Sequence, residues 1–289
     1  MASQDNDHRF CWERVNESNT LFRISHLFAP DQFSDQILAL YALFASIDQV
    51  SHLVSEEQVA RRKLEWWRCE LKPKNLAESR HPVVRYLKNS GATDFFPAQA
   101  VEALFSAADA RLDMRPPSDL QEFRSLCSLI YQPRIHLECA VCSGLGVEIP
   151  DFRMASVNGG LLELLRESCG RPERTFWWVP LNLLAHFSIS RRELGQNLNS
   201  QSAQALFRAI FEENEQLKTE EAEPVSIISP LVPGQMHVLL MAALKSRQID
   251  RLAIERPGSY AAEMARWRVS DVFAAWKLRR KLNETIATD

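Results

Sequence analysis

Glycine is scarce in this sequence, with 9 residues among 289, so the regular turn signals that separate β-strands are missing. Apolar residues recur instead at steps of three and four, which is the spacing of one face of an α-helix. One such stripe consists of Ile37, Leu40, Tyr41, Phe44 and Ile47. The sequence therefore predicts an all-α protein.

Long apolar runs and a large excess of charge are also missing. No stretch approaches the length of a bilayer-spanning helix, and the formal net charge of −3 gives no overall attraction to nucleic acid. Residues 1–7 are polar and acidic, unlike a secretory signal or a transit peptide. We expect a cytoplasmic protein without a nucleic-acid partner, and peripheral membrane contact remains open.

The six cysteines are irregularly spaced and do not predict a disulfide framework. Cys139 and Cys142 have CxxC spacing, and His136 lies one helical turn earlier. A redox motif requires a strand-to-helix setting that the sequence lacks, and a zinc site requires ligands that no second CxxC supplies. We predict that both thiols are reduced core residues on a helix.

Common motifs of catalytic and metal sites are absent as well. The sequence contains no glycine-rich phosphate loop, no HExxH pair and no EF-hand loop. No combination of serine, histidine and aspartate identifies a nucleophilic triad. Any active site must therefore be found from a less general pattern.

The periodic stretches and the prolines between them predict a succession of helices. We expect these helices near residues 32–53, 56–71, 97–112, 118–144, 152–169, 200–219, 232–248 and 258–281. Pro133 should kink or split the fourth helix, and Asp119 should cap its start. We predict one domain over 1–289, with an N-terminal segment (1–31), a helical core (32–281) and a tail (282–289).

Two segments carry a more specific pattern. Residues 40–52 read Leu-Tyr-Ala-Leu-Phe-Ala-Ser-Ile-Asp-Gln-Val-Ser-His, and residues 63–71 read Lys-Leu-Glu-Trp-Trp-Arg-Cys-Glu-Leu. In residues 163–180, Arg166 and Glu167 precede the pair Val179-Pro180. Together these segments resemble the squalene/phytoene synthase family. The resemblance implies an isoprenoid-synthase-like helical bundle with a central cavity.

The resemblance also implies a chemistry, because active members of the family join two prenyl diphosphates with Mg²⁺ held by carboxylates on two facing helices. On the first helix, Tyr41, Asp48 and His52 fall on one face at helical spacing. Asp48 is retained, whereas Gln49 and His52 occupy positions where the family has aspartates. A histidine offers Mg²⁺ a nitrogen in place of the oxygen that it prefers.

The second acidic motif is altered in the same way. Glu167 stands at its first aspartate and Arg171 at its second, and Arg166 precedes them. A guanidinium repels Mg²⁺, so we hypothesise that Arg171 replaces the metal and neutralises Asp48 and Glu167. The alternative is a solvated Arg171 with no particular partner. If Mg²⁺ is bound at all, Asp48 and Glu167 are its candidate ligands.

These losses leave two hypotheses about function. In the first, the vestigial site of Tyr41, Asp48, His52, Arg166, Glu167 and Arg171 has no catalytic role. The protein is then an assembly, scaffold or lipid-binding factor that acts on a protein partner or a prenyl ligand. A relative of this fold that is similar in lacking the acidic motifs, the mitochondrial complex I assembly factor, is non-catalytic. In the second, the protein is an active farnesyl or geranylgeranyl diphosphate transferase that uses Mg²⁺.

The last predicted helix, 258–281, is rich in basic residues and contains Trp267 and Trp276. Such a helix can lie on an anionic membrane surface. It can equally be a packed terminal helix with a solvated basic end. We therefore retain peripheral membrane contact through 258–281 as an expectation.

Overall fold

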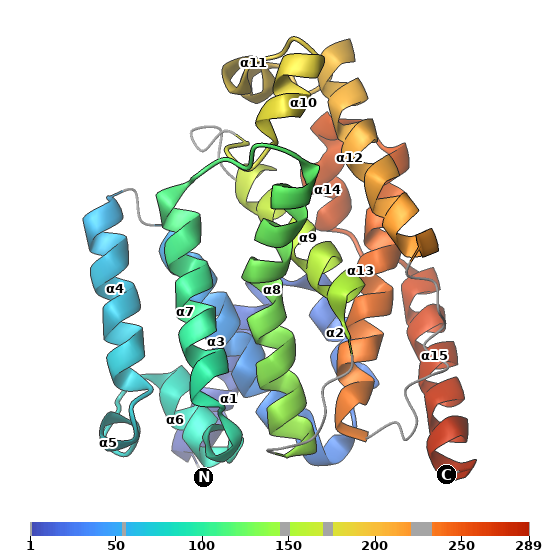
Figure 1. Cartoon of the computed structure of the whole chain (residues 1–289). Helices are drawn as coiled ribbons and strands as arrows, with labels where there is room; N and C mark the ends of the chain where they lie inside the picture. The colour runs from blue at the N-terminus through green and yellow to red at the C-terminus, as the bar shows by residue number, and fades with distance from the viewer. Residues whose placement is uncertain (1, 54–55, 145–150, 170–175, 221–232, 289) are drawn as a thin grey trace.

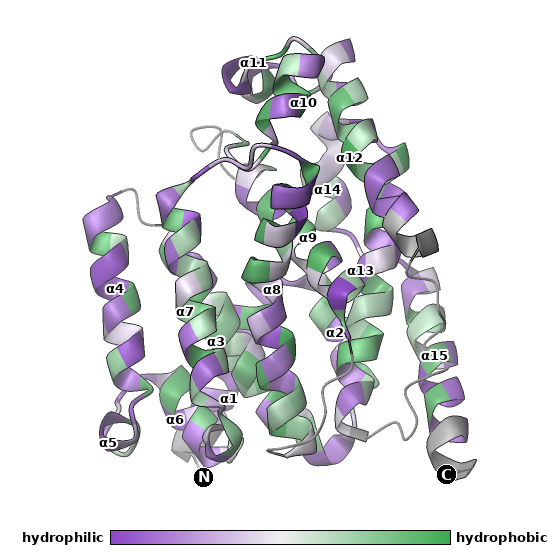
Figure 2. Cartoon of the chain, viewed as in Figure 1, coloured by the Kyte–Doolittle hydropathy of each residue, from purple (hydrophilic) through white to green (hydrophobic). Residues whose placement is uncertain are grey.

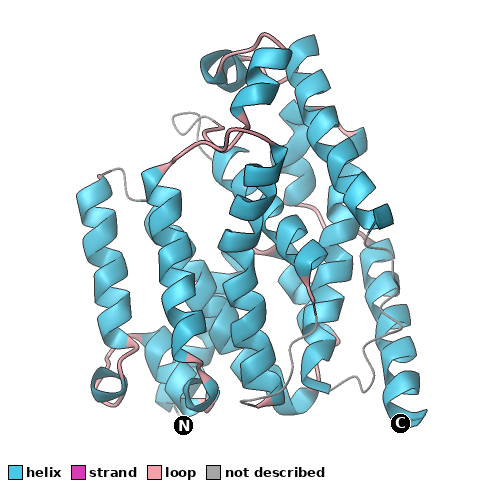
Figure 3. Cartoon of the chain, viewed as in Figure 1, coloured by secondary structure: helices cyan, strands magenta, loops and turns pink. Residues whose placement is uncertain are grey.

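The computed structural model describes residues 2–53, 56–144, 151–169, 176–220 and 233–288. Its helices are α1 (Ala2–Ser18), α2 (Thr20–Leu27), α3 (Ser34–Leu53), α4 (Glu57–Glu70), α5 (Pro73–Leu76), α6 (Pro82–Asn89), α7 (Ala98–Asp113), α8 (Leu120–Ser143), α9 (Arg153–Cys169), α10 (Leu181–His186), α11 (Arg191–Gln196), α12 (Gln201–Glu220), α13 (Met236–Ile254), α14 (Tyr260–Met264) and α15 (Val269–Thr288). Short 3₁₀ turns join some of them, and the described residues contain no strand (Figure 3). The all-α prediction is confirmed.

The long helices stand side by side around α3 and α8, and the short helices α10 and α11 lie together at one end (Figure 1). Helix α8 packs against both α7 and α9, α3 packs against α8, and α13 packs against α9. Five helices, α3, α7, α8, α9 and α13, therefore enclose the middle of the molecule. Hydrophobic positions run along α3, whereas α4 at the edge is mostly hydrophilic (Figure 2).

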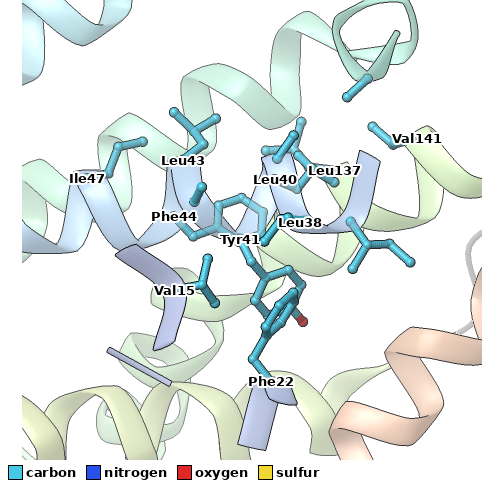
Figure 4. Close-up of a cluster of buried hydrophobic side chains, with 14 of the residues drawn as sticks. Val15, Phe22, Leu38, Leu40, Tyr41, Leu43, Phe44, Ile47, Leu137 and Val141 are labelled. Carbon is cyan, nitrogen blue, oxygen red and sulfur yellow. The ribbon is translucent and has the colours of Figure 1, made fainter. Parts of the chain in front are cut away.

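The largest apolar cluster surrounds α3. Figure 4 shows Leu38, Leu40 and Tyr41 of this helix among buried side chains from other elements. The ring of Phe22, from α2, lies 4.7 Å from that of Tyr41 between centroids. The segment before residue 32 thus forms helices that pack into this core. Burying a large apolar side chain such as Phe22 contributes about 2 kcal/mol to stability.

A second apolar cluster is built around Trp178, which is fully buried and stacks on Phe123 of α8. The indole nitrogen of Trp178 donates a hydrogen bond of 2.8 Å to Ser168 Oγ in α9. This polar contact fixes the end of α9 against the residues that lead into α10. The second acidic motif is therefore held on a rigid support.

Close packing of α8 and α9 depends on a glycine. A Cβ atom at Gly160 would lie 2.2 Å from the backbone oxygen of Cys127, a distance that no carbon atom can occupy. The absent side chain lets the two backbones approach, and this approach brings the inner face of α9 toward the centre.

Several expectations about helices were wrong in detail. The predicted helix 258–281 is two helices, α14 and α15, with a break between Met264 and Val269. Pro133 does not split α8, which runs through it, and the kink expected as the other effect stays a prediction. The carbonyl that loses its partner belongs to Leu129, which is on the exposed face, where water can satisfy it.

Other local expectations are confirmed. Asp119 precedes α8 and its side chain accepts a hydrogen bond of 2.9 Å from the backbone N–H of Glu122. Cys139 and Cys142 are buried free thiols on α8. Burial, together with the nearby Glu138, raises the pKa of Cys139 to about 12, so the thiol is protonated at neutral pH.

Candidate functional site: a buried charge network

The centre of the site is Asp48, which α3 presents to the interior together with Tyr41, two helical turns earlier. Asp48 Oδ1 accepts hydrogen bonds from Arg111 Nη1 at 2.6 Å and from Arg134 Nη2 at 2.5 Å. Its other oxygen, Oδ2, accepts from Arg134 Nη1 at 3.0 Å. Both oxygens of this carboxylate are therefore bound by guanidinium groups.

Arg111 joins the two acidic motifs. Its side chain comes from α7 and is buried, with 1% of the residue exposed. While Nη1 binds Asp48 on α3, Nε and Nη2 lie 3.2 and 3.1 Å from Glu167 Oε2 on α9. A single guanidinium thus bridges the two helices that carry the two predicted motifs, and its planar fork suits such bidentate contacts.

A second group of charges surrounds Glu163, one turn before Glu167 on α9. Its carboxylate accepts a hydrogen bond from Arg166 Nη1 at 2.8 Å. Arg134 Nη1 and Lys245 Nζ lie 3.7 and 3.9 Å from it. The ammonium of Lys245 is also 3.7 Å from the ring centroid of Tyr131. The lysine is held by an ion pair and a cation–π contact.

A polar chain continues from Tyr41 toward α2. The Tyr41 hydroxyl donates to Glu138 Oε2 at 3.0 Å, and His237 Nδ1 lies 2.5 Å from Glu138 Oε1. His237 Nε2 in turn lies 3.0 Å from Ser25 Oγ. No sequence pattern indicates this Ser–His–Glu set, because its members come from three helices far apart in the chain.

Ser25 has a hydrogen-bond partner besides His237. Its hydroxyl donates to the Phe22 carbonyl oxygen of its own helix at 3.1 Å, while its oxygen lies 3.0 Å from His237 Nε2. In a nucleophilic triad the serine would donate its proton to the histidine instead. The Ser25–His237–Glu138 chain is a structural element that links α2, α13 and α8.

Burial and charge act on the network in opposite directions. Burial would raise the pKa of Glu163, but attraction to Arg166, then to Arg134 and Lys245, outweighs it and lowers the pKa to about 2. Burial would lower the pKa of Arg111, yet Glu167 and Asp48 raise it. Glu163 and Arg111 are therefore ionised at neutral pH, whereas burial lowers the pKa of Lys245 to about 7 against the attraction of Glu163.

The donor set does not fit Mg²⁺. The metal requires several free oxygen ligands in octahedral geometry, whereas the carboxylates of Asp48, Glu163 and Glu167 are already bound by arginine. Four basic side chains contact these three carboxylates. They are Arg111, Arg134, Arg166 and Lys245. A divalent ion at this position would meet a site whose negative charge has already been neutralised.

A small cavity lies beside the network among the described residues. It has a volume of about 10 Å³, which is room for about one water molecule. It is lined by Tyr41, Tyr131, Arg134, Ile135, Glu138, Ala155, Val238, Met241, Ala242 and Lys245. In this part of the bundle the aromatic and cationic side chains fill the interior.

The structure brings four of the predicted site residues into one region. Asp48 and Glu167 share Arg111, Arg166 binds Glu163 beside them, and Tyr41 continues the chain through Glu138. His52 lies in the last turn of α3, but its side chain is outside the described part of the chain, as is Arg171. The role predicted for Arg171, neutralising Asp48 and Glu167, therefore stays a prediction, and among the described residues Arg111 and Arg134 contact these carboxylates.

These arginines were missed because nothing in the sequence marks them as partners of Asp48. They lie 63 and 86 residues from it in the chain. One signal was present: Arg111 continues the apolar stripe of Leu104 and Ala108 at a step of three, which places a charged residue on a buried face. A charge in such a position requires a buried partner.

Replacing Lys245 with methionine should stabilise the protein, and the gain should depend on pH. Because the folded-state pKa of about 7 lies below the unfolded value, the unfolded chain binds an extra proton between about pH 7 and pH 10. The stability gap between Lys245→Met and the parent should therefore shrink by about 2 kcal/mol between about pH 6 and pH 9. Urea unfolding of both proteins at each pH measures this gap.

The comparison of the two proteins cancels the contribution of the buried cysteine thiols, which titrate alike in both. Lys277→Met, at an exposed position of α15, is the matched control. The difference in stability between this variant and the parent should not change with pH. A gap that widens toward high pH would contradict a lysine whose pKa is lowered in the folded state.

Comparisons with known proteins agree with this architecture. A sequence model described as squalene/phytoene synthase matches residues 15–269. A dehydrosqualene synthase solved in complex with a ligand is similar in structure, with a TM-score of 0.69 over 99% of this chain and 98% of that chain, at 14% identity. Squalene synthase HpnC from Alicyclobacillus acidocaldarius gives a TM-score of 0.55 over 88% and 96%, at 15% identity.

At these identities the structural likeness shows the fold alone, and it confirms the predicted isoprenoid-synthase-like helical bundle. A search of curated protein sequences found no match. What the site does must therefore be argued from its own residues.

Proposed function

The chain belongs to the squalene/phytoene synthase family, and from this premise we propose that it is a non-catalytic member that acts as an assembly, scaffold or lipid-binding factor. Its partner would be another protein or a prenyl lipid. In such a member the helical framework binds its partner without prenyl transfer.

One observation carries the proposal: arginine side chains occupy the space between the two acidic motifs. Arg111 is within hydrogen-bond distance of both Asp48 and Glu167, and Arg134 binds the remaining oxygen of Asp48. A diphosphate leaving group needs Mg²⁺ or free cations to stabilise its developing charge. Here the cations are engaged by the carboxylates that would otherwise hold the metal.

The small cavity beside the network also supports this proposal. A cavity of about 10 Å³ next to Arg134 and Glu138 has no room for an isoprenoid chain. Opening it would require separating Tyr41 from Glu138, or Lys245 from Glu163. Each separation would leave a buried polar group without its partner, which costs roughly 1–3 kcal/mol.

An active prenyl transferase is the alternative, and one observation favours it. Four cationic side chains converge on the site, and Lys245 Nζ has no hydrogen-bond partner among the described residues. If the ion pairs exchanged partners, Arg134 and Lys245 could bind a diphosphate in place of a metal. This reading requires the enzyme to be independent of Mg²⁺ or nearly so.

Diphosphate release tests the two alternatives. The purified protein is incubated with farnesyl or geranylgeranyl diphosphate, with and without Mg²⁺, and released diphosphate is measured against an active dehydrosqualene synthase. We expect release no faster than in buffer with Mg²⁺ alone. Release above that background that disappears in Asp48→Asn would reject the non-catalytic proposal.

A further inference from the structure

Helix α15 presents an apolar stripe to solvent. Val269, Phe273 and Trp276 follow one another at steps of four and three, so they lie on one face of the helix. They are exposed to 63%, 66% and 51%, and Trp267, just before the helix, is exposed to 52%. Isolated exposed apolar residues are ordinary, but a stripe of aromatic residues on one face calls for a partner.

The opposite face of α15 is fixed to the protein. Asp271 is fully buried and accepts a hydrogen bond of 2.7 Å from Arg251 Nη1 of α13. Ala275 and Leu282 are buried, and α15 contacts α13 and α2. Helix α15 forms the edge of the molecule (Figure 1), so its stripe faces away from the bundle.

An open groove extends this apolar surface toward the end of α2. It has a volume of about 440 Å³ and is lined by Phe28, Trp276, Arg279, Arg280, Asn283 and Glu284. Leu27, the neighbour of Phe28, is 68% exposed. The apolar surface therefore involves two helices and ends at a pair of arginines.

The charge around the stripe has one dominant sign. Residues 266–281 contain six basic side chains and one acidic side chain, Asp271, which is buried and paired. The rest of the chain is acidic enough to give an overall net charge of −3. Lys277 and Lys281 are exposed next to the stripe. Positive charge is thus concentrated where the aromatic side chains are exposed.

We infer that this surface, formed by Trp267, Val269, Phe273 and Trp276 with the flanking basic residues of α15, docks on an anionic lipid bilayer. Aromatic side chains favour the interface between acyl chains and headgroups, and lysine and arginine favour anionic headgroups. No helix in the described part of the chain is long and apolar enough to cross a bilayer. Helix α15 lies in the plane of the interface, with the groove at Phe28 open to a lipid acyl chain.

Vesicle flotation with the full-length protein tests this inference. The vesicles contain either phosphatidylcholine alone or phosphatidylcholine mixed with phosphatidylserine. We expect binding to the mixed vesicles that weakens with salt, and at least tenfold weaker binding to phosphatidylcholine alone, because each basic residue near the surface contributes about fivefold.

Two variants examine the two parts of the surface separately. Phe273→Ser with Trp276→Ser should lower the partition coefficient on mixed vesicles at least tenfold. Trp66→Ser with Leu129→Ser removes exposed side chains from α4 and α8 and should leave it unchanged. Thermal unfolding establishes that each variant is folded.

The charge variant, Lys277→Glu with Lys281→Glu, changes only exposed positions and should abolish the preference for phosphatidylserine. Binding that is absent, or equal in the aromatic variant and its control, would overturn the inference. So would a dimer that requires Phe273 and Trp276 and does not bind vesicles, because the stripe would then belong to an interface between two copies of the chain.

Discussion

Replacing Arg111 with methionine is expected to lower the free energy of unfolding by about 4 kcal/mol. Methionine fills a similar volume, so the loss comes from charge. The guanidinium contacts Asp48 at 2.6 Å and Glu167 at 3.1 Å, and all three groups are shielded from water. Without Arg111 the buried Glu167 carboxylate loses a main counter-charge, and it must either be hydrated by opening the bundle or be protonated.

Urea unfolding at neutral pH measures this loss. Arg111→Met combined with Glu167→Leu should recover most of it, because Asp48 keeps its two contacts with Arg134 and no uncompensated charge remains. Arg61→Met is the control for a surface arginine. Arg61 binds Glu57 and Asp113 at a partly exposed position on the surface, so the change should cost less than about 1 kcal/mol.

If Arg111→Met costs no more than Arg61→Met, the buried bridge between the two motifs does not exist in solution. The proposed function would then lose its main support, because an open pair of acidic motifs could again accept metal. The same variant therefore tests the fold and the argument about catalysis with one measurement.

Replacing Glu138 with leucine is expected to cost about 3 kcal/mol, the second large effect. Its two carboxylate oxygens accept from the Tyr41 hydroxyl at 3.0 Å and contact His237 Nδ1 at 2.5 Å. Both partners are buried, so leucine would leave a hydroxyl and an imidazole nitrogen with no acceptor. Chemical unfolding gives the loss, and a change in the tyrosine absorbance would report on Tyr41.

Glu138→Gln is the conservative comparison, since an amide oxygen can still accept from Tyr41. We expect it to cost about half as much as Glu138→Leu. Equal costs for both variants would show that charge alone matters at this position, and a negligible cost for both would contradict the Ser25–His237–Glu138 chain.

The buried network favours one arrangement of the helices that carry it. Replacing a buried ion pair by well-packed apolar residues is often neutral or stabilising, so the network is weak evidence for stability as such. What it does require is one relative position of α3, α7, α8 and α9, because Asp48, Arg111, Arg134 and Glu167 must meet. A protein that serves as a scaffold benefits from such a fixed arrangement.

Much of the fold could be predicted from the sequence because helical periodicity is a local property. The stripe from Ile37 to Ile47 marks α3 correctly, and Asp119 marks the start of α8. The break between α14 and α15 was missed, because no proline or glycine lies between Met264 and Val269. The backbone turns there while Asp271 is drawn into the interior by Arg251, a contact that no local pattern encodes.

The sequence by itself determined the helical class and which residues stand in the two motif segments, since the identity and spacing of Asp48, His52 and Glu167 are written in it. Only the tertiary structure decided which cations contact the carboxylates there. Arg111 and Arg134 reach Asp48 across 63 and 86 residues of chain. The partner of a buried charge is set by which helix faces it, and that depends on the packing of the whole bundle.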